Sequence, residues 1–263
     1  MDEDLELSEE ENDTAVMTVD PHISVCIPYH SNTTGLAVTL ATLQAQVLPP
    51  SKIIVIDTSP DKSGWDICKR YQTNVKIICE VAKTPIYESW NRGIELAGDD
   101  DVLIINDDLL FPINFIDVLF VVKHSVPALC YVPITPSREH SADYVNTNFE
   151  WWAEVPSSLE QLTETFWMPG FCFMLSRQAI KEIGTFDTRF KVWFGDDDYQ
   201  ARLHEAAGRL KVPAIVQIKP LFAYHYGGSS FKYHSKEVQK KISVDRKAYL
   251  AKYGERKPEV KGA

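Results

Sequence analysis

Short apolar runs alternate with amphipathic segments through the first half of the chain. The apolar runs are rich in Val and Ile, and they predict β-strands at residues 22–28, 52–57, 74–80 and 101–106. Apolar residues recur at helical spacing in the segments between them, at residues 34–47, 65–71 and 86–97. Strands that alternate with helices indicate βαβ units. The pattern therefore predicts an α/β fold with a mainly parallel sheet covered by helices on both faces.

The pattern becomes less regular after Pro133. Residues 135–162 are polar, aromatic and broken, which is typical of a loop or lid. Order returns at Trp167 with further predicted elements: a strand at 171–176, a helix at 177–183 ending at Gly184, a helix at 198–207 ending at Gly208, and strands at 214–218 and 221–224. No internal repeat is evident, so we predict one principal domain over residues 22–231.

The two ends of the chain carry opposite charges, within a net charge of −10. Residues 2–20 hold nine acidic and no basic side chains. So acidic a segment buries too little apolar surface to order itself, which predicts a disordered tail over residues 1–21. Residues 232–263 hold ten basic and four acidic side chains, with apolar residues at roughly helical intervals. We predict a basic amphipathic helical extension there, which is usually a solvated face but could bind an anionic membrane surface or nucleic acid.

The chain has no features of a membrane or secreted protein. No run approaches the ~18 uncharged apolar residues that a transmembrane helix requires, and the acidic N-terminus lacks the layout of a secretory signal. The five cysteines are scattered among mostly apolar neighbours, which fits buried thiols better than a zinc site or disulfides. We therefore expect a cytoplasmic protein without a transmembrane segment.

Carboxylates end two of the predicted strands. Asp57 ends one, and the tripeptide Asn106–Asp108 ends the other. Ligands of parallel sheets sit beyond the carboxyl ends of the strands. The oxygens of Asn106–Asp108 suit Mg²⁺ or Mn²⁺ together with substrate phosphates, and Asp57 with Asp61 could bind a nucleobase or ribose. The alternative is that both are ordinary acidic turns, because Asp favours turns.

Three adjacent carboxylates, Asp196–Asp198, stand at the start of a predicted helix. Helix N-termini favour negative charge, so capping is one interpretation. Three acids exceed what a cap needs, and a partly buried Asp could deprotonate an acceptor hydroxyl. Asp198 is best placed to pair with Arg202, four residues further along the helix. His225, at a strand end before two glycines, is either structural or a ligand for a metal or a pyrophosphate.

In their order along the chain, these segments resemble the inverting glycosyltransferases of family 2, which have the GT-A fold. The resemblance extends from about Ile23 to Ser230. In the first half of the chain it rests on a first strand (24–29), a nucleotide-binding turn (54–61), an N-x-G segment (87–93) and a D-x-D strand (103–108). In the second half it rests on a long signature before the acceptor site (169–190), an E-D-x-D-x-x-x-R element (195–202) and an H-x-G-G-x-S loop (225–230).

The resemblance implies a GT-A (Rossmann-like) domain that transfers a sugar from a nucleotide-sugar donor to an acceptor hydroxyl with inversion. The donor would be a UDP-, GDP- or dTDP-sugar, and Mn²⁺ or Mg²⁺ would assist. Asp196 aligns with the catalytic base, although Asp197 fits with a shift of one residue. Asp108 and His225 would bind the metal. The residues implied in donor binding are Pro28, Tyr29, Asp57, Asp61, Asn91, Asn106 and Asp107.

The chain departs from the family pattern at three positions. Asn106 replaces the first acid of D-x-D, so that metal binding would depend on Asp108, with Asp107 assisting. Thr58 replaces the second acid of the nucleotide turn. Gly195 replaces the Glu before the base, which leaves the choice between Asp196 and Asp197 open.

The acceptor and two rival functions remain open at this stage. The resemblance implies a glycan or a lipid-linked glycan as acceptor. The basic helix, with Trp151, Trp152 and Trp167, could instead hold a nucleic acid whose hydroxylated base receives the sugar. The first rival is a nucleotidyltransferase, which would carry a Gly-rich basic segment after the first strand. Residues 29–36 have one Gly and no Lys or Arg, which disfavours this rival. A non-catalytic module that binds a nucleotide-sugar is the second rival.

Overall fold

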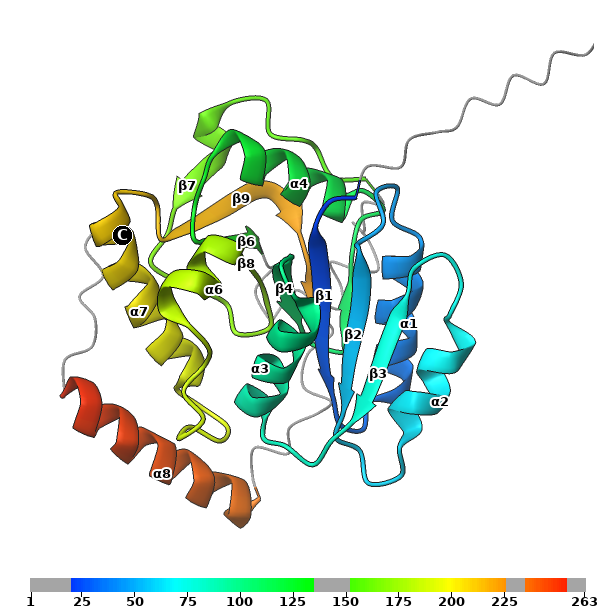
Figure 1. The fold of residues 1–263 in the computed structure, drawn as a ribbon, viewed down its shortest axis with the longest axis vertical. Helices are drawn as coiled ribbons and strands as arrows, with labels where there is room; N and C mark the ends of the chain where they lie inside the picture. Colours follow the sequence, from blue (N-terminus) through cyan, green and yellow to red (C-terminus); the bar gives the residue numbers. More distant parts are fainter. Residues whose placement is uncertain (1–19, 135–151, 226–234, 255–263) are drawn as a thin grey trace, which may run out of the picture.

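The computed structural model describes residues 20–134, 152–225 and 235–254, which form a central sheet with helices on both sides (Figure 1). The strands of the central sheet are β1 (Ile23–Tyr29), β2 (Lys52–Asp57), β3 (Ile77–Val81), β4 (Asp101–Ile105), β6 (Cys130–Ile134), β7 (Leu162–Glu164), β8 (Cys172–Leu175) and β9 (Ile215–Phe222). A second, two-stranded sheet contains β5 (Leu109–Leu110) and β10 (Tyr224–His225). The helices are α1 (Thr33–Gln44), α2 (Ser63–Arg70), α3 (Ile86–Ala97), α4 (Phe115–Ser125), α6 (Arg177–Ile183), α7 (Gly195–Leu210) and α8 (Lys236–Tyr253), with a short 3-10 helix η1 (Leu159–Gln161).

The central sheet is mainly parallel. Its strand order is β3-β2-β1-β4-β8-β6-β9-β7. Parallel pairs join β1 to β2 and β4, β2 to β3, and β6 to β9. Strand β8 runs antiparallel between β4 and β6, and β7 is antiparallel to β9. The predicted α/β fold is confirmed, and β1, β2 and β4 end at the same edge of the sheet.

The central strands β1, β2 and β4 bury side chains on both faces of the sheet. In β1, Val25 and Ile27 join the cluster that α1, α2 and α4 cover. Cys26 lies between them and joins the opposite cluster, which α3, α6 and α7 cover. All three are fully buried. Because successive residues of a strand face opposite sides, burial on both faces explains why the strands read as continuous apolar runs.

Helix α7 differs from its prediction at both ends. It begins at Gly195 instead of residue 198, and its first turn includes all three carboxylates of Asp196–Asp198. It continues through Gly208 and ends before Lys211, whose φ of 59° is left-handed. The prediction that Gly208 caps this helix is therefore wrong.

Other differences lie in the second half of the chain. The pattern missed α4 and β6, and the strands predicted at 214–218 and 221–224 are the single strand β9 followed by β10. Of the predicted loop at 135–162, residues 152–162 are described and include η1. Residues 1–19 lie outside the described residues, so the predicted acidic tail and the domain boundaries stay predictions.

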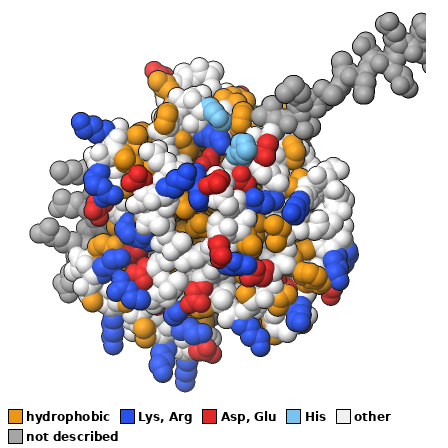
Figure 2. All heavy atoms as spheres, in the orientation of Figure 1, with side chains coloured by type: hydrophobic (Ala, Val, Ile, Leu, Met, Phe, Trp, Pro, Cys, Tyr) orange, Lys and Arg blue, Asp and Glu red, His pale blue; other side chains and the backbone are white. Residues whose placement is uncertain are grey.

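The predicted C-terminal helix is present as α8, which lies along the outside of α7 (Figure 1). Its outer face exposes basic side chains, and Figure 2 shows Lys and Arg gathered at the lower left, where α8 lies in Figure 1. Within the described part of the chain, none of the helices combines the length and the apolar character needed to cross a membrane.

Candidate functional site

Three of the predicted site segments meet around Phe171, just before β8. The carbonyl of Phe171 accepts a hydrogen bond from the N–H of Asn106 at 2.9 Å. Its ring stacks on His225, with 4.5 Å between the ring centroids. The preceding residue, Gly170, is so close to Asp196 that a Cβ there would overlap a carboxylate oxygen. The end of β4, the start of α7 and β10 therefore form one site beyond the carboxyl end of β4.

Asp108 and His225, the predicted metal ligands, lie side by side in this site. Antiparallel pairing of β10 with β5 places His225 opposite Leu109, next to Asp108 in sequence. His225 Nε2 lies 3.0 Å from Asp108 Oδ1, and Asp108 is 4% exposed. That oxygen accepts no hydrogen bond from the described residues. Apart from the ring nitrogen of His225, this buried carboxylate oxygen has no donor among the described residues, which suits it to binding a cation.

The geometry of the pair fits a divalent metal ion. Two neighbouring ligands of an octahedral Mg²⁺, each at about 2.1 Å, lie about 3 Å apart, close to the spacing between Asp108 and His225. Among residues 20–134, 152–225 and 235–254, no group of three or more His, Cys, Asp or Glu side chains could hold a metal. Mg²⁺ ordinarily uses one or two protein ligands and completes its shell with water and substrate phosphates, so a pair of ligands is sufficient. Asp107 is buried and Asn106 is half-buried beside them.

Asp196 is the carboxylate that lies closest to the Phe171 segment. Its Oδ1 accepts a hydrogen bond from the Tyr87 hydroxyl at 3.0 Å, and its Oδ2 faces Gly170. Burial, together with the charge of Asp196, raises the pKa of Tyr87 well above its usual value, so the hydroxyl stays protonated and donates. Burial also raises the pKa of Asp196, although the hydrogen bond from Tyr87 opposes the shift. Asp196 is thus held in one orientation with a basicity closer to neutral pH.

Asp197 is half-buried on the same turn. Burial and the neighbouring charge of Asp196 together raise the pKa of Asp197 to about 6. Both carboxylates therefore have the raised pKa that is common in groups performing acid–base chemistry.

Asp198 has a structural environment. It is fully buried, and its Oδ2 accepts a hydrogen bond from Arg202 Nε at 3.0 Å, which confirms the predicted pair. Its Oδ1 accepts from the Tyr253 hydroxyl at 2.8 Å and from Lys252. Because these partners occupy both oxygens, Asp198 joins α8 to α7 and is not available to a substrate.

The turn before α7 is strained and tightly packed. Phe194 has a φ of 69°, a left-handed conformation that costs about 1–2 kcal/mol for a residue with a side chain. At Gly195, a Cβ would lie 2.5 Å from the ring of Tyr87. The family's Glu therefore has no room at position 195, which accounts for this departure from the pattern.

The predicted nucleotide turn is built around Asp57. This residue is fully buried. Its Oδ1 accepts hydrogen bonds from the Ser59 N–H (2.9 Å) and hydroxyl (2.6 Å), and its Oδ2 accepts from the Trp65 N–H (3.0 Å). Asp57 therefore shapes the connection from β2 to α2, and its contact with the nucleotide stays a prediction.

The other predicted donor residues near this turn are more accessible or lie beside it. Asp61 is exposed and accepts a hydrogen bond from the Ser63 N–H at 3.1 Å. Tyr29 is buried at the end of β1, with its hydroxyl 2.8 Å from Ser63 Oγ, and Pro28 precedes it, half-buried. These positions lie at the same edge of the sheet as Asp57.

Asn91 holds the protein's own backbone. Its Nδ2 donates to the Phe186 carbonyl at 2.9 Å, and its Oδ1 accepts from the Phe186 N–H at 2.7 Å. Asn91 thus fixes the loop between α6 and α7 on α3. A direct contact with the donor, as the resemblance implies, stays a prediction.

Trp167 lies on a rigid segment three residues before Gly170. Its side chain is 61% exposed. The Met168 N–H donates to Gln200 at 2.8 Å, and the Phe166 carbonyl lies 3.1 Å from His204 Nε2, so α7 holds the backbone on both sides. A large exposed ring on a fixed backbone is suited to stacking against a ligand. Trp152 is also exposed, and Trp151 lies outside the described residues.

Two residues that shape the site were missed from the sequence. Tyr87 lies within the N-x-G segment, but its contact with Asp196 joins residues 109 positions apart. Asp245 of α8 accepts hydrogen bonds from the turn before α7. The only sequence signal for Asp245 was an acid within a basic amphipathic helix.

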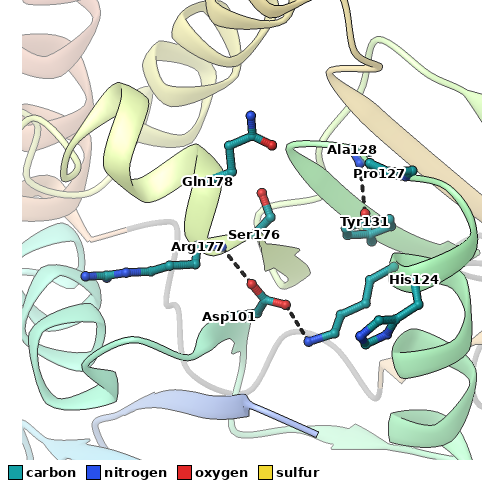
Figure 3. A pocket seen from close by; sticks show the side chains of 9 residues that line it. Asp101, His124, Pro127, Ala128, Tyr131, Ser176, Arg177 and Gln178 are labelled. Atoms are coloured by element: carbon teal, nitrogen blue, oxygen red, sulfur yellow. Dashed lines mark hydrogen bonds and ion pairs between the residues drawn. The ribbon is translucent and has the colours of Figure 1, made fainter.

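A cavity of about 220 Å³ lies at the opposite edge of the sheet (Figure 3). It surrounds Asp101, the first residue of β4, which forms a 2.8 Å ion pair with Lys123 and accepts a hydrogen bond from the Arg177 N–H at 2.7 Å. A second cavity, of about 420 Å³, lies between α3 and the loop that Asn91 holds. The first cavity is separate from the candidate site, because the site lies beyond the other end of β4.

Comparison with known families and structures agrees with the fold. The family model for glycosyl transferase family 2 matches residues 24–184. The chain is similar to the crystal structure of GalNAc-T7 with UDP, GalNAc and Mn²⁺, at 14% identity and a TM-score of 0.59, covering 87% of this chain and 49% of that chain. It is also similar to S. aureus TarS residues 1–349 in complex with UDP, at 14% identity and a TM-score of 0.55, covering 85% of this chain and 64% of that chain.

These structural likenesses concern the fold. The chain spans between about half and two thirds of the length of these two solved structures. No curated protein sequence matches it.

Proposed function

This chain belongs to glycosyl transferase family 2, and we propose that it transfers a sugar from a nucleotide-sugar donor to an acceptor hydroxyl, with inversion and with the help of a divalent metal ion. The observation that carries the proposal is the meeting of Asp196 with the Asp108–His225 pair around Phe171. A direct sugar transfer requires a base for the acceptor hydroxyl and a metal site for the leaving diphosphate, close to each other.

Asp196 would be the catalytic base. It would accept the proton of the acceptor hydroxyl as that oxygen attacks the anomeric carbon, and a single displacement inverts the configuration there. The hydrogen bond from Tyr87 orients the carboxylate, and burial raises its pKa so that it is a stronger base. Among the described contacts, Tyr87 donates this hydrogen bond to Asp196 and not to Asp197. We therefore favour Asp196 over Asp197 as the base.

Asp108 and His225 would hold Mn²⁺ or Mg²⁺. When bound, the ion would offset the charge that develops on the leaving nucleoside diphosphate. Asp107 and Asn106 lie beside the pair, in the turn that follows β4, and would assist in binding the metal. The stacking of His225 on Phe171 fixes the imidazole plane, so that Nε2 keeps its orientation toward Asp108.

UDP-sugars are the first donors to test. Both GalNAc-T7 and TarS have been crystallised with UDP. The nucleotide would lie along the edge near Pro28, Tyr29, Asp57 and Asp61, with Asn91 supporting the site from α3. GDP- and dTDP-sugars remain alternatives, because Thr58 stands where the family has a second acid.

A glycan or lipid-linked glycan is the acceptor that the site favours. Trp167 offers an exposed ring three residues before Gly170, which packs against Asp196, and aromatic rings stack well on the apolar face of a sugar. A nucleic acid with a hydroxylated base is the alternative acceptor. The net charge of −10 and the acidic first turn of α7 would repel a phosphate backbone near the catalytic base Asp196, which disfavours a nucleic acid.

The basic outer face of α8 would bring the protein to an anionic membrane surface that carries such an acceptor. The exposed basic side chains of this helix include Lys236, Lys240, Lys241, Arg246 and Lys247. Val244 is also exposed on this helix, at 55%, which suits a lipid surface better than a nucleic acid backbone. A cytoplasmic location stays a prediction.

The deciding experiment measures release of nucleoside diphosphate from UDP-, GDP- and dTDP-sugars with Mn²⁺ or with EDTA. We expect metal-dependent release from one donor, and its loss in Asp108→Asn and Asp196→Asn. Glu205→Gln, at an exposed position that pairs with Arg209, controls for loss of charge alone. If a donor binds but is not turned over, the protein is a binding module. If no donor binds in the presence of metal, the proposed function is wrong.

A further inference from the structure

Helix α8 places a buried carboxylate against the turn that precedes Asp196. Asp245 is 0% exposed. Its Oδ2 accepts hydrogen bonds from the N–H groups of Val192 at 2.8 Å and Trp193 at 3.0 Å, and both of its oxygens lie 3.1 Å from the N–H of Lys191. One carboxylate therefore binds three consecutive backbone donors, which fixes the conformation of residues 191–193.

The fixed turn leads directly to the proposed base. Phe194 follows it in a left-handed conformation, and its ring lies 5.2 Å from that of Tyr249 of α8. Gly195 comes next, packed on Tyr87, and Asp196 follows. A residue with a side chain persists in the left-handed region only where its surroundings hold it there. Asp245 and Tyr249 of α8 supply part of that support.

We propose that Asp245 is a positioning residue for the glycosyl transfer, holding the turn that orients Asp196; this inference rests on the proposed function. A carboxylate only accepts hydrogen bonds, so it can satisfy three N–H groups at once. In an Asp245→Asn variant, the amide NH₂ group would replace one carboxylate oxygen and face at least one of these backbone N–H groups, which it cannot accept. Helix α8 lies beyond residues 24–184, which match the family, so this chain supplies the support from a segment outside that match.

The docking of α8 has a second, independent anchor. Asp198 binds Lys252 and Tyr253 near the end of the helix, two turns away from Asp245. Removing the Asp245 charge should therefore leave α8 in place while it releases the turn. A positioning role can thus be separated from a general role in folding.

The test compares Asp245→Asn with the wild-type protein on the donor that the wild type uses. We expect kcat to fall by about 10- to 100-fold, as small displacements of catalytic groups do. KM for the donor and the affinity for the nucleoside diphosphate should stay within about twofold, because the metal pair and the nucleotide turn are untouched. Glu237→Gln is the matched control. It removes one charge from the same helix at an exposed residue that pairs with Lys241, and should leave kcat unchanged.

Four outcomes overturn the proposal. If folded Asp245→Asn keeps kcat within twofold of wild type, Asp245 does not position the base. If kcat and donor affinity fall together, Asp245 maintains the whole fold. If Asp245→Asn does not fold, Tyr249→Ala replaces it, and an unchanged kcat in that variant refutes support by α8. A wild-type protein that turns over no donor refutes the proposed function and this inference together, whereas an active wild type limits any failure to the inference.

Discussion

We call the part of the candidate site after β2 and β4 the donor half and the part around α7 the acceptor half, after their proposed roles. The two halves hold their carboxylates by different means. In the donor half, Asp57 hydrogen-bonds to Ser59 and Trp65, two and eight residues away. In the acceptor half, Asp196 hydrogen-bonds to Tyr87, 109 residues away. Contacts within a short turn form with the turn itself, whereas distant contacts require several elements to dock first.

The comparison teaches where each half is sensitive to change. A substitution in the nucleotide turn acts on one βα connection. In the acceptor half, the helices α3, α7 and α8 meet around the segment that leads into α7. Asn91 and Tyr87 of α3 and Asp245 of α8 hold this segment and the start of α7. A substitution in any of these helices should therefore reach the chemistry without contacting the substrate.

The largest expected effect comes from the base in the acceptor half. Asp196→Asn should lower kcat by about 10²- to 10⁴-fold, since it removes general-base catalysis and leaves the shape of the site. Asp197→Asn should lower kcat by less than about 10-fold. Both effects are measured as nucleoside diphosphate release at saturating donor and acceptor. The reverse ranking would make Asp197 the base.

The next effect concerns the metal pair, which combines a local residue with a distant one. His225→Ala should raise the Mn²⁺ concentration needed for half-maximal activity at least about 10-fold, because a ligand is lost. A titration of Mn²⁺ into metal-free protein measures this. The control is His124→Ala, at the opposite edge of the sheet beside the cavity of Figure 3. Equal Mn²⁺ requirements in the two variants would rule out His225 as a ligand.

Breaking the donor half should affect stability more than chemistry. Asp57→Ala leaves three buried donors without a partner and should lower the free energy of unfolding by about 1–3 kcal/mol. Urea unfolding followed by circular dichroism measures the change. The exposed Asp61→Ala should cost less than about 0.5 kcal/mol. A similar loss in both variants would contradict the structural role of Asp57.

The smallest effect is a gain of stability in the acceptor half. A carboxyl whose pKa rises on folding stabilises the protein below its unfolded pKa, and this contribution is lost as pH rises through the folded value, about 6 for Asp197. Asp197→Asn has no charge to bury, so at pH 7.5 it should raise the free energy of unfolding by about 1 kcal/mol, allowing for partial exposure. At pH 4 the gain should vanish. Thermal unfolding at both pH values measures this, and an equal gain at pH 4 would exclude a charge effect.

The parallel sheet and the carboxylates at the ends of its strands could be predicted because their signals are local. Continuous apolar runs marked β2 and β4, and the carboxylates at their ends marked the edge where the site lies. The pair of Asp198 with Arg202 was predicted for the same reason, since both residues lie on one helix turn. The Gly208 cap was wrong because a helix end depends on what packs against it, and α7 continues through that glycine.

By itself, the sequence determined the alternation of strands and helices from β1 to β4, the two-sided burial of these strands and the residue types at their carboxyl ends. These follow from apolar periodicity and from the geometry of parallel strands, which act within about ten residues. Only the tertiary structure decided which of three adjacent acids faces the site, which one is buried against α8, and that Asp245 and Tyr87 hold the turn between them. The reason is that side chains far apart in sequence meet only after the helices dock, so a local sequence pattern does not predict these contacts.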